Sequence, residues 1–352
     1  MSFLRFGATA LARAAELVKG RAPSALPTLV PPLEFPCRIE KLPEGCADID
    51  NELYGEAEHA ATWHGTDPSS TLATLRLLNA ARIPYFDRVW RQQLRLGPDR
   101  PGAFLEVGCG GGIATGALAE LGYGMTGVEP AAASLDEARA HAERLGLPEE
   151  RLRFTQGDAY DLSMFGEASF DGVVMADVLE HLYDLPAAIA QVRRVLRPGG
   201  VLVFDTINRT YASYVLAIAL AQEGLGMVPP RTHDWRMFVQ PHELSFLLQA
   251  HGFTADTAQF RGMAPSFAPS PLGAIAAARR AIAERAPPAL PISDFVEIGS
   301  LEVNYLGFAL RRDQRTSERD EARDQAGGAP GVSGHAPGEL ARGLSEARRG
   351  GL

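Results

Sequence analysis

Three glycines at alternate positions follow a short apolar run about a third of the way along the chain. Residues 103–107 form the run, which suits a strand buried on both faces of a sheet, and Gly108, Gly110 and Gly112 come directly after it. Because glycine has no Cβ, the backbone here can turn sharply and lie close to a ligand. Residues 113–121 then fit a helix, so the stretch predicts a strand, a glycine loop and a helix N-terminus that suit a nucleotide-like ligand.

The spacing of these glycines excludes two common nucleotide-binding loops. A dinucleotide fingerprint counted from Gly108 would need a glycine at Ile113, and the Gly-Lys-Ser/Thr of a P-loop is absent from the sequence. Two acids flank the loop, since Glu106 stands two residues before Gly108 and Glu129 ends the next apolar run. A carboxylate about 20 residues beyond the loop, at the tip of the second strand, is placed to accept both hydroxyls of a ribose. The alternative is a tight turn beside an unrelated acid.

In type and spacing these residues resemble those of class I S-adenosylmethionine-dependent methyltransferases. More narrowly, the chain is similar to the O-methyltransferases of ubiquinone biosynthesis, which methylate polyprenyl catechols and demethylubiquinol. The resemblance extends over roughly residues 54–312. It is carried by LEVGCGGG at 105–112, TGVEP at 126–130, VLEHL at 178–182, LRPGG at 196–200, DTINRT at 205–210, MVPPRTHDWRMFVQPHEL at 227–244 and VNYL at 303–306.

The resemblance implies a cofactor site for S-adenosylmethionine. Asp158, just beyond the third expected strand, would accept a hydrogen bond from the adenine amino group. Arg82 stands in the arginine place of a Leu-His-x-x-Asn-x-x-x-Arg pattern on an N-terminal helix and would pair with the methionine carboxylate. The histidine of that pattern is Arg76 here, which is a departure from the family. The full set of expected cofactor residues is Arg82, Glu106, Gly108, Gly110, Glu129, Asp158, Ala159 and Ala176.

Two acids and a histidine follow the fourth expected strand, which covers residues 171–175. On a helical turn Asp177, Glu180 and His181 would share one face and could hold Mg²⁺, with His181 as a ligand or as a base. The matching family residues are Glu, Glu and His and are implicated in metal binding. Leu-Glu-His turns also occur in methyltransferases that use no metal, and a free histidine would then take the proton. His181 and His233 are the two candidate catalytic bases.

The order of apolar runs and glycine-closed helices predicts an α/β fold. We expect a doubly wound, mostly parallel seven-stranded sheet of the Rossmann-like methyltransferase kind, with ligands beyond the carboxyl ends of the strands. The expected strands cover residues 103–107, 125–128, 152–156, 171–175, 201–206, 254–261 and 301–310. The expected helices include 135–145, opened by a capping box of Ser134 with Glu137, and 186–196, 211–225 and 242–251.

Composition shifts divide the chain into a leader with a proline-rich linker (1–47), a methyltransferase domain (48–312) and a disordered tail (313–352). Within the domain, residues 48–95 form a helical lid, and residues 210–240 and 264–297 are inserts on the substrate or membrane side; residues 272–285 are expected to be helical. The first insert combines an apolar helix with Arg231, Trp235 and Arg236, which suits a bilayer interface, although an ordinary lid helix fits as well. The leader suits a membrane surface, a transit peptide or an exposed helix.

The overall composition limits the partners. A net charge of −9 and a pI near 5.5 argue against a nucleic-acid substrate. Three cysteines without disulfide or zinc spacing fit a reducing cytosol. We therefore expect a cytoplasmic O-methyltransferase, peripheral on the inner face of the membrane if the insert touches lipid. Its acceptor would be a small phenolic molecule with a lipid tail; the alternatives are an unprenylated natural product and a non-catalytic scaffold. The sequence does not indicate the oligomeric state.

Overall fold

A computed structural model describes residues 30–32, 35–43, 45–65, 72–94, 102–224, 228–267 and 292–313 of the chain. Three of the expected segments lie outside these ranges in whole or in large part. They are the leader, the helix expected at residues 272–285 inside the second insert, and the tail beyond Asp313.

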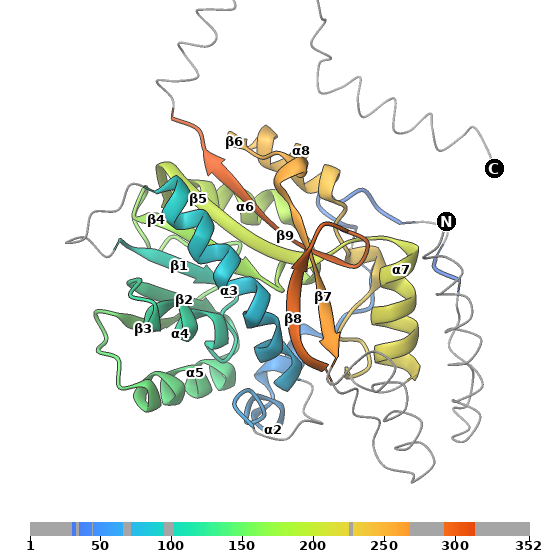
Figure 1. Cartoon of the computed structure of the whole chain (residues 1–352), viewed down its shortest axis with the longest axis horizontal. Helices are drawn as coiled ribbons and strands as arrows, with labels where there is room; N and C mark the ends of the chain where they lie inside the picture. The colour runs from blue at the N-terminus through green and yellow to red at the C-terminus, as the bar shows by residue number, and fades with distance from the viewer. Residues whose placement is uncertain are drawn as a thin grey trace, which may run out of the picture. The chain divides into compact units, whose positions relative to one another are not determined.

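A sheet of nine strands runs through the described residues (Figure 1). Its order is β3-β2-β1-β4-β5-β9-β7-β8, with the short β6 paired to β9. Strands β1 to β5 are parallel, β9 is antiparallel to β5, and β7 is antiparallel to β9 and so runs the same way as β5. The mostly parallel α/β fold is therefore confirmed. The strands are Phe104–Val107, Met125–Glu129, Leu152–Gln156, Phe170–Ala176, Leu196–Ile207, Phe253–Thr254, Arg261–Phe267, Ile292–Ile298 and Asn304–Arg311.

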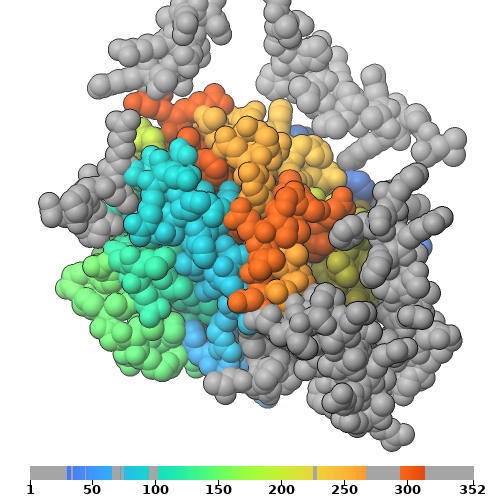
Figure 2. Space-filling model, in the orientation of Figure 1, coloured from blue at the N-terminus to red at the C-terminus, as the bar shows by residue number. Residues whose placement is uncertain are grey.

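The expected count of seven strands is too low because of the C-terminal part of the sheet. The strand expected at 254–261 is wrong for most of its length, because it overlaps β6 and β7 by one residue each. Between them lies the turn η6 (Thr257–Gln259), where the Asp256 carboxylate accepts a hydrogen bond from Ala258 N at 2.9 Å. Strand β8 (Ile292–Ile298) lies in the insert in which only a helix was expected. It pairs with β7 and lies beside helix α3 (Figure 2). Arg88 of α3 pairs with Glu297 of β8 at 2.6 Å.

Helices cover both faces of the sheet. On one face α3 and α4 bury a cluster around Trp90 and Phe104, and α3 crosses the sheet in Figure 1. On the other face α6 and α8 bury a second cluster with Leu202 and Phe204 of β5. The Asp184 carboxylate caps α6 by accepting from Ala187 N at 3.0 Å. The bounds are Ala73–Gln93 for α3, Ile113–Glu120 for α4, Ala132–Leu145 for α5, Leu185–Val195 for α6 and Pro241–Ala250 for α8.

The first insert is helical, as expected. A turn, α7 (Tyr211–Ser213), leads into the π-helix η4 (Tyr214–Gly224), and η5 (Trp235–Met237) follows the loop. Tyr214, Ile218 and Trp235 are buried together, while Tyr211 and Leu216 are 57% and 47% exposed. One side of this helix therefore packs on the domain and the other carries exposed apolar side chains.

The N-terminal segment is packed more closely than a linker would be. Arg38 is fully buried, and its guanidinium donates hydrogen bonds to the carbonyls of Leu179 at 3.1 Å and Leu182 at 2.6 Å. Two short helices follow, η2 (Asn51–Gly55) and α2 (Ala57–Ala60). Arg38 is thus packed on the domain, which a composition argument could not show, and the domain boundary at residue 47 stays a prediction. Among the described residues, no helix is long and apolar enough to cross a membrane.

Candidate active site

The glycine loop and Glu129 meet at the carboxyl ends of β1 and β2, as the sequence predicts. Gly110 N donates a hydrogen bond to Glu129 Oε2 at 3.0 Å, and Ala131 N donates to the other oxygen at 3.1 Å. Gly108 has φ of 75°, and a Cβ there would lie 2.5 Å from Val178 Cγ2, so only glycine fits. Burial raises the pKa of the Glu129 carboxyl. Its contact with a ribose stays a prediction.

Three further expected cofactor residues lie at the same edge of the sheet. Asp158 follows β3, is exposed, and accepts a hydrogen bond from Tyr160 N at 2.7 Å, while Gly157 N bonds to Glu129 O at 3.2 Å. Ala159 comes next and is buried, and Ala176 ends β4. Because β1 to β4 are parallel neighbours, their carboxyl ends form one continuous edge. The adenine contact proposed for Asp158 is untested.

A lid from the N-terminal segment covers the loop. The Trp63 ring lies so close to the loop that a Cβ on Gly110 would come within 2.5 Å of Trp63 Cζ2. Trp63 Nε1 donates to Ser134 Oγ at 2.9 Å, and Ser134 Oγ donates to the carbonyl of Tyr54 at 2.7 Å. The predicted capping box at Ser134 is therefore wrong: Ser134 lies inside α5, whose N-cap is Ala131, and its hydroxyl fixes the lid.

Arg82 is buried between two carboxylates. Its guanidinium pairs with Asp177, and with Asp205 Oδ2 at 2.8 Å, while its Nε has no hydrogen-bond partner among the described residues. The two acids offset the cost of burying the arginine charge and hold its pKa above the ordinary value. Contact with the methionine carboxylate was predicted for Arg82 and stays a prediction. Asp205 was missed as a site residue, although an acid inside an apolar strand was a visible signal.

Two carboxyls beside this cluster are driven toward the neutral form. Burial raises the pKa of Glu106 to about 7, partly offset by the hydrogen bond from Thr115. Burial and the nearby Asp177 raise the pKa of Glu180 to about 8. Glu180 Oε2 accepts from Thr206 Oγ1 at 2.8 Å, and Oε1 has no partner among the described residues. The site therefore favours positive charge or bound protons near these acids.

The three expected Mg²⁺ ligands do not converge. Asp177 has a left-handed φ of 51° and precedes a turn of only three residues, Leu179–His181, so the α-helical spacing assumed from sequence is wrong. Asp177 turns to Arg82 and Glu180 to Thr206, whereas His181 faces Asn51. In the described parts of the chain, no group of three or more His, Cys, Asp or Glu is arranged to hold a metal ion.

The two candidate bases face one another. The rings of His181 and His233 lie 5.4 Å apart between centroids at an angle of 47°. Burial lowers the pKa of His181 to about 3, with a further contribution from His233, and lowers that of His233 to about 4; the Asp177 charge acts in the opposite direction on both. Both imidazoles are therefore uncharged at neutral pH.

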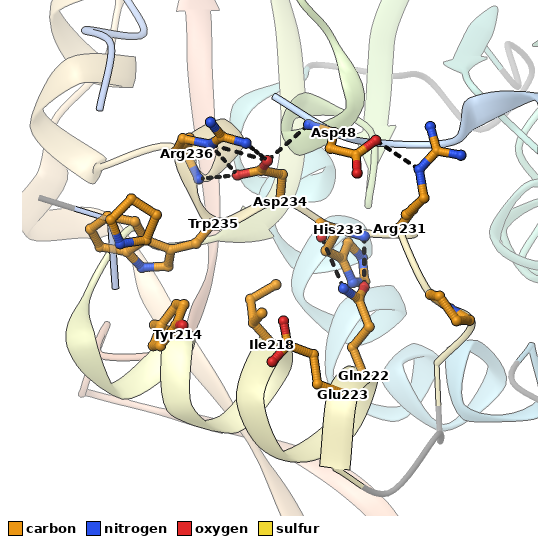
Figure 3. A pocket seen from close by; sticks show the side chains of 12 residues that line it. Asp48, Tyr214, Ile218, Gln222, Glu223, Arg231, His233, Asp234, Trp235 and Arg236 are labelled. Atoms are coloured by element: carbon orange, nitrogen blue, oxygen red, sulfur yellow. Dashed lines mark hydrogen bonds and ion pairs between the residues drawn. The ribbon is translucent and has the colours of Figure 1, made fainter. Parts of the chain in front are cut away.

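A cavity of about 420 Å³ opens beside His233 (Figure 3). The π-helix η4 and the loop of residues 230–236 form most of it, and Pro32 and Asp48 complete it from the N-terminal segment. Gln222 holds the His233 backbone by two hydrogen bonds of 2.9 and 3.2 Å (Figure 3). The wall mixes apolar and charged side chains, namely Tyr214, Ile218, Trp235, Glu223, Arg231, Asp234 and Arg236. The sequence predicted that the first insert lies on the substrate side, but it did not predict that Asp48 lines the cavity.

The sheet, the glycine loop and the acids beside it together indicate the class of protein to which the chain belongs. A family model described as "Methyltransferase domain" matches residues 105–204, which span β1 to most of β5. The protein is an S-adenosylmethionine-dependent methyltransferase.

Comparison with known proteins gives the family. The ubiquinone biosynthesis O-methyltransferase of Methylobacterium nodulans is 34% identical over 212 residues, which cover 58% of this chain and 83% of that protein. Its counterpart in Methylobacterium sp. strain 4-46 is 37% identical over 204 residues, covering 56% and 80%. That of Paramagnetospirillum magneticum is 30% identical over 251 residues, covering 70% and 88%. The chain belongs to the family of ubiquinone biosynthesis O-methyltransferases.

Proposed function

We propose that the protein methylates a phenolic or catechol hydroxyl of a polyprenylated ubiquinone precursor. The names of the relatives support the reaction and the substrate class. The structural observation that carries the proposal is the pair of facing histidine rings, His181 and His233, 5.4 Å apart, with His233 in the wall of a cavity large enough for a substituted ring. A proton acceptor beside the acceptor pocket is what transfer to a hydroxyl requires.

Different residues of the chain bind the cofactor, align the acceptor and take up the proton during methyl transfer. S-adenosylmethionine, when bound, supplies an activated methyl group on a sulfonium that is already a good leaving group. The glycine loop and Glu129 hold it at the ends of β1 and β2, and Trp63 covers the loop. The cavity aligns the hydroxyl with the methyl group, and the histidine pair takes the hydroxyl proton. The Asp177 carboxylate favours the protonated form of both histidines, because it raises both pKa values.

Mg²⁺ is a separate hypothesis that rests on the resemblance. The carboxylates of Asp177 and Glu180 have the oxygen chemistry of a magnesium site, but their side chains do not converge with His181. The steps assigned to the side chains in methyl transfer therefore involve no metal. The hypothesis predicts that EDTA abolishes turnover and that added Mg²⁺ restores it; full turnover in EDTA excludes it.

The lipid tail and a peripheral membrane position belong to the same proposal. Tyr211 and Leu216 are exposed on the helical insert that also forms the cavity wall, so a tail leaving the cavity would meet apolar side chains. Such a surface suits contact with the cytoplasmic face of a bilayer. Co-sedimentation with anionic vesicles tests this, and loss of binding in Leu216→Glu is the expected result.

The reaction is tested with S-adenosylmethionine carrying a labelled methyl group. We expect purified protein to methylate a short-chain prenylated catechol, with a higher kcat/KM than for the same catechol without its prenyl chain. Glu129→Ala should abolish turnover by losing the cofactor, which titration with S-adenosylhomocysteine measures independently. Equal kcat/KM for both acceptors would favour an unprenylated natural product, and cofactor binding without any turnover would favour a scaffold.

A further inference from the structure

Asn51 makes two hydrogen bonds to a single residue of the site. Its Nδ2 donates to the main-chain carbonyl of His181 at 3.0 Å, and its Oδ1 lies 3.0 Å from His181 Nδ1. An amide nitrogen can only donate and a carbonyl can only accept, so the first bond fixes the orientation of the amide group. The amide oxygen therefore faces Nδ1, and that ring nitrogen must carry the proton.

The proton on Nδ1 decides which atom of His181 can act as a base. In a neutral imidazole with Nδ1–H, the lone pair lies on Nε2. The edge of the ring is further confined by Tyr54, whose ring stands 5.9 Å away at 85°, and by His233 at 5.4 Å. We propose that Asn51 is a positioning residue that fixes the tautomer and orientation of His181 so that Nε2 receives the acceptor's proton. The proposal rests on the proposed function.

The segment that carries Asn51 is itself anchored to the loop of residues 230–236. Asp50 N donates to the carbonyl of Arg231 at 2.8 Å, and Asp48 N donates to Asp234 Oδ2 at 2.9 Å. The Asp48 carboxylate also pairs with the Arg231 guanidinium at 2.7 Å. The amide of Asn51 is thus held on a backbone that is fixed to the loop in the cavity wall, as a positioning group requires.

The direct test reads the tautomer of His181. In protein labelled with ¹⁵N-histidine, long-range ¹H–¹⁵N correlation spectra distinguish the protonated ring nitrogen from the bare one, and His181→Gln identifies the signal. We expect Nδ1–H in the wild type and loss of this preference in Asn51→Leu. His251 is an internal control, because its Nδ1 faces the carbonyl of Leu247 at 2.9 Å and should keep its proton in every variant.

Kinetics separate positioning from a general effect on the fold. We expect Asn51→Leu to lower kcat about 10- to 100-fold, by analogy with the loss of a hydrogen-bond partner that orients a metal-bound histidine, with little change in KM. Asn51→Asp keeps an acceptor for Nδ1–H and should retain most of the wild-type kcat. Glu52→Leu alters the neighbouring exposed position on the same turn and should leave kcat unchanged.

Three results would overturn the proposal. One is Asn51→Leu with an unchanged Nδ1–H signal, another is a normal kcat in that variant, and the third is an equal loss in Glu52→Leu. Asn51→Ala replaces Asn51→Leu if the latter does not fold. Absence of turnover in the wild type would contradict the proposed function instead, and the tautomer measurement would still test Asn51.

Discussion

The Gly110→Ala variant tests whether the lid and the glycine loop act together in binding the cofactor. Gly110 has a left-handed φ of 50°, and an added Cβ would lie within 2.5 Å of the Trp63 ring. The backbone conformation alone costs about 1–2 kcal/mol for a residue with a Cβ. Moving Trp63 away also breaks its hydrogen bond to Ser134, worth about 0.5–1.5 kcal/mol.

These contributions predict a measurable loss of affinity. If the free loop relaxes and the bound loop cannot, about 2–3 kcal/mol is lost on binding, which corresponds to roughly 30- to 150-fold weaker affinity. Titration calorimetry with S-adenosylhomocysteine measures it. Gly146→Ala is the matched control, because Gly146 has a similar φ of 65° but no atom within 4 Å of an added Cβ. Trp63→Leu in the Gly110→Ala background should recover part of the affinity. Wild-type affinity in Gly110→Ala, or an equal loss in Gly146→Ala, would refute the reasoning.

Three further predictions concern charge and catalysis. The Glu106 pKa of about 7 lies above its ordinary value of 4.5. The protonated carboxyl therefore contributes fully to the free energy of unfolding below pH 4.5, and this contribution is lost as the pH rises through 7. Between pH 4.5 and 8, the free energy of unfolding measured with urea should therefore fall by about 3 kcal/mol less in Glu106→Gln than in the wild type. An equal fall in the two proteins would contradict this. Arg82→Leu leaves the buried Asp205 charge unpaired and should lower the free energy of unfolding by about 3–5 kcal/mol; a change below 1 kcal/mol would show that the pair is not needed. His233→Ala should reduce kcat by about 10²- to 10⁴-fold with unchanged affinity for S-adenosylhomocysteine, and full activity would remove this histidine from the chemistry.

The parallel half of the fold could be predicted because its signals are local. Strands β1, β2 and β4 are mostly apolar runs followed directly by a loop or a turn. The expected ranges of β1 to β4 agree with the structure to within one residue at each end, while β5 begins five residues earlier than expected. β8 could not be found this way. Its residues, 292–298, alternate weakly, and their strand conformation depends on pairing with β7, a contact that no short window of sequence contains.

The site shows the same division between local and long-range information. The nearness of Gly110 and Glu129 follows from the order of two adjacent parallel strands, so sequence spacing was sufficient. The metal hypothesis assumed a regular helix, and the left-handed backbone at Asp177 removed the basis for that spacing. The contact of Trp63 with the glycine loop could not be predicted, because it depends on how the lid folds onto a loop nearly fifty residues further along the chain.

Quinone analysis in cells tests the central claim most directly. The gene would be deleted in the organism that encodes this chain, and the quinone pool would be measured by mass spectrometry. We expect ubiquinone to fall and a prenylated precursor one methyl group lighter than its product to accumulate. The wild-type gene should restore the pool, and Glu129→Ala should not. An unaltered quinone pool in the deletion strain would contradict the account.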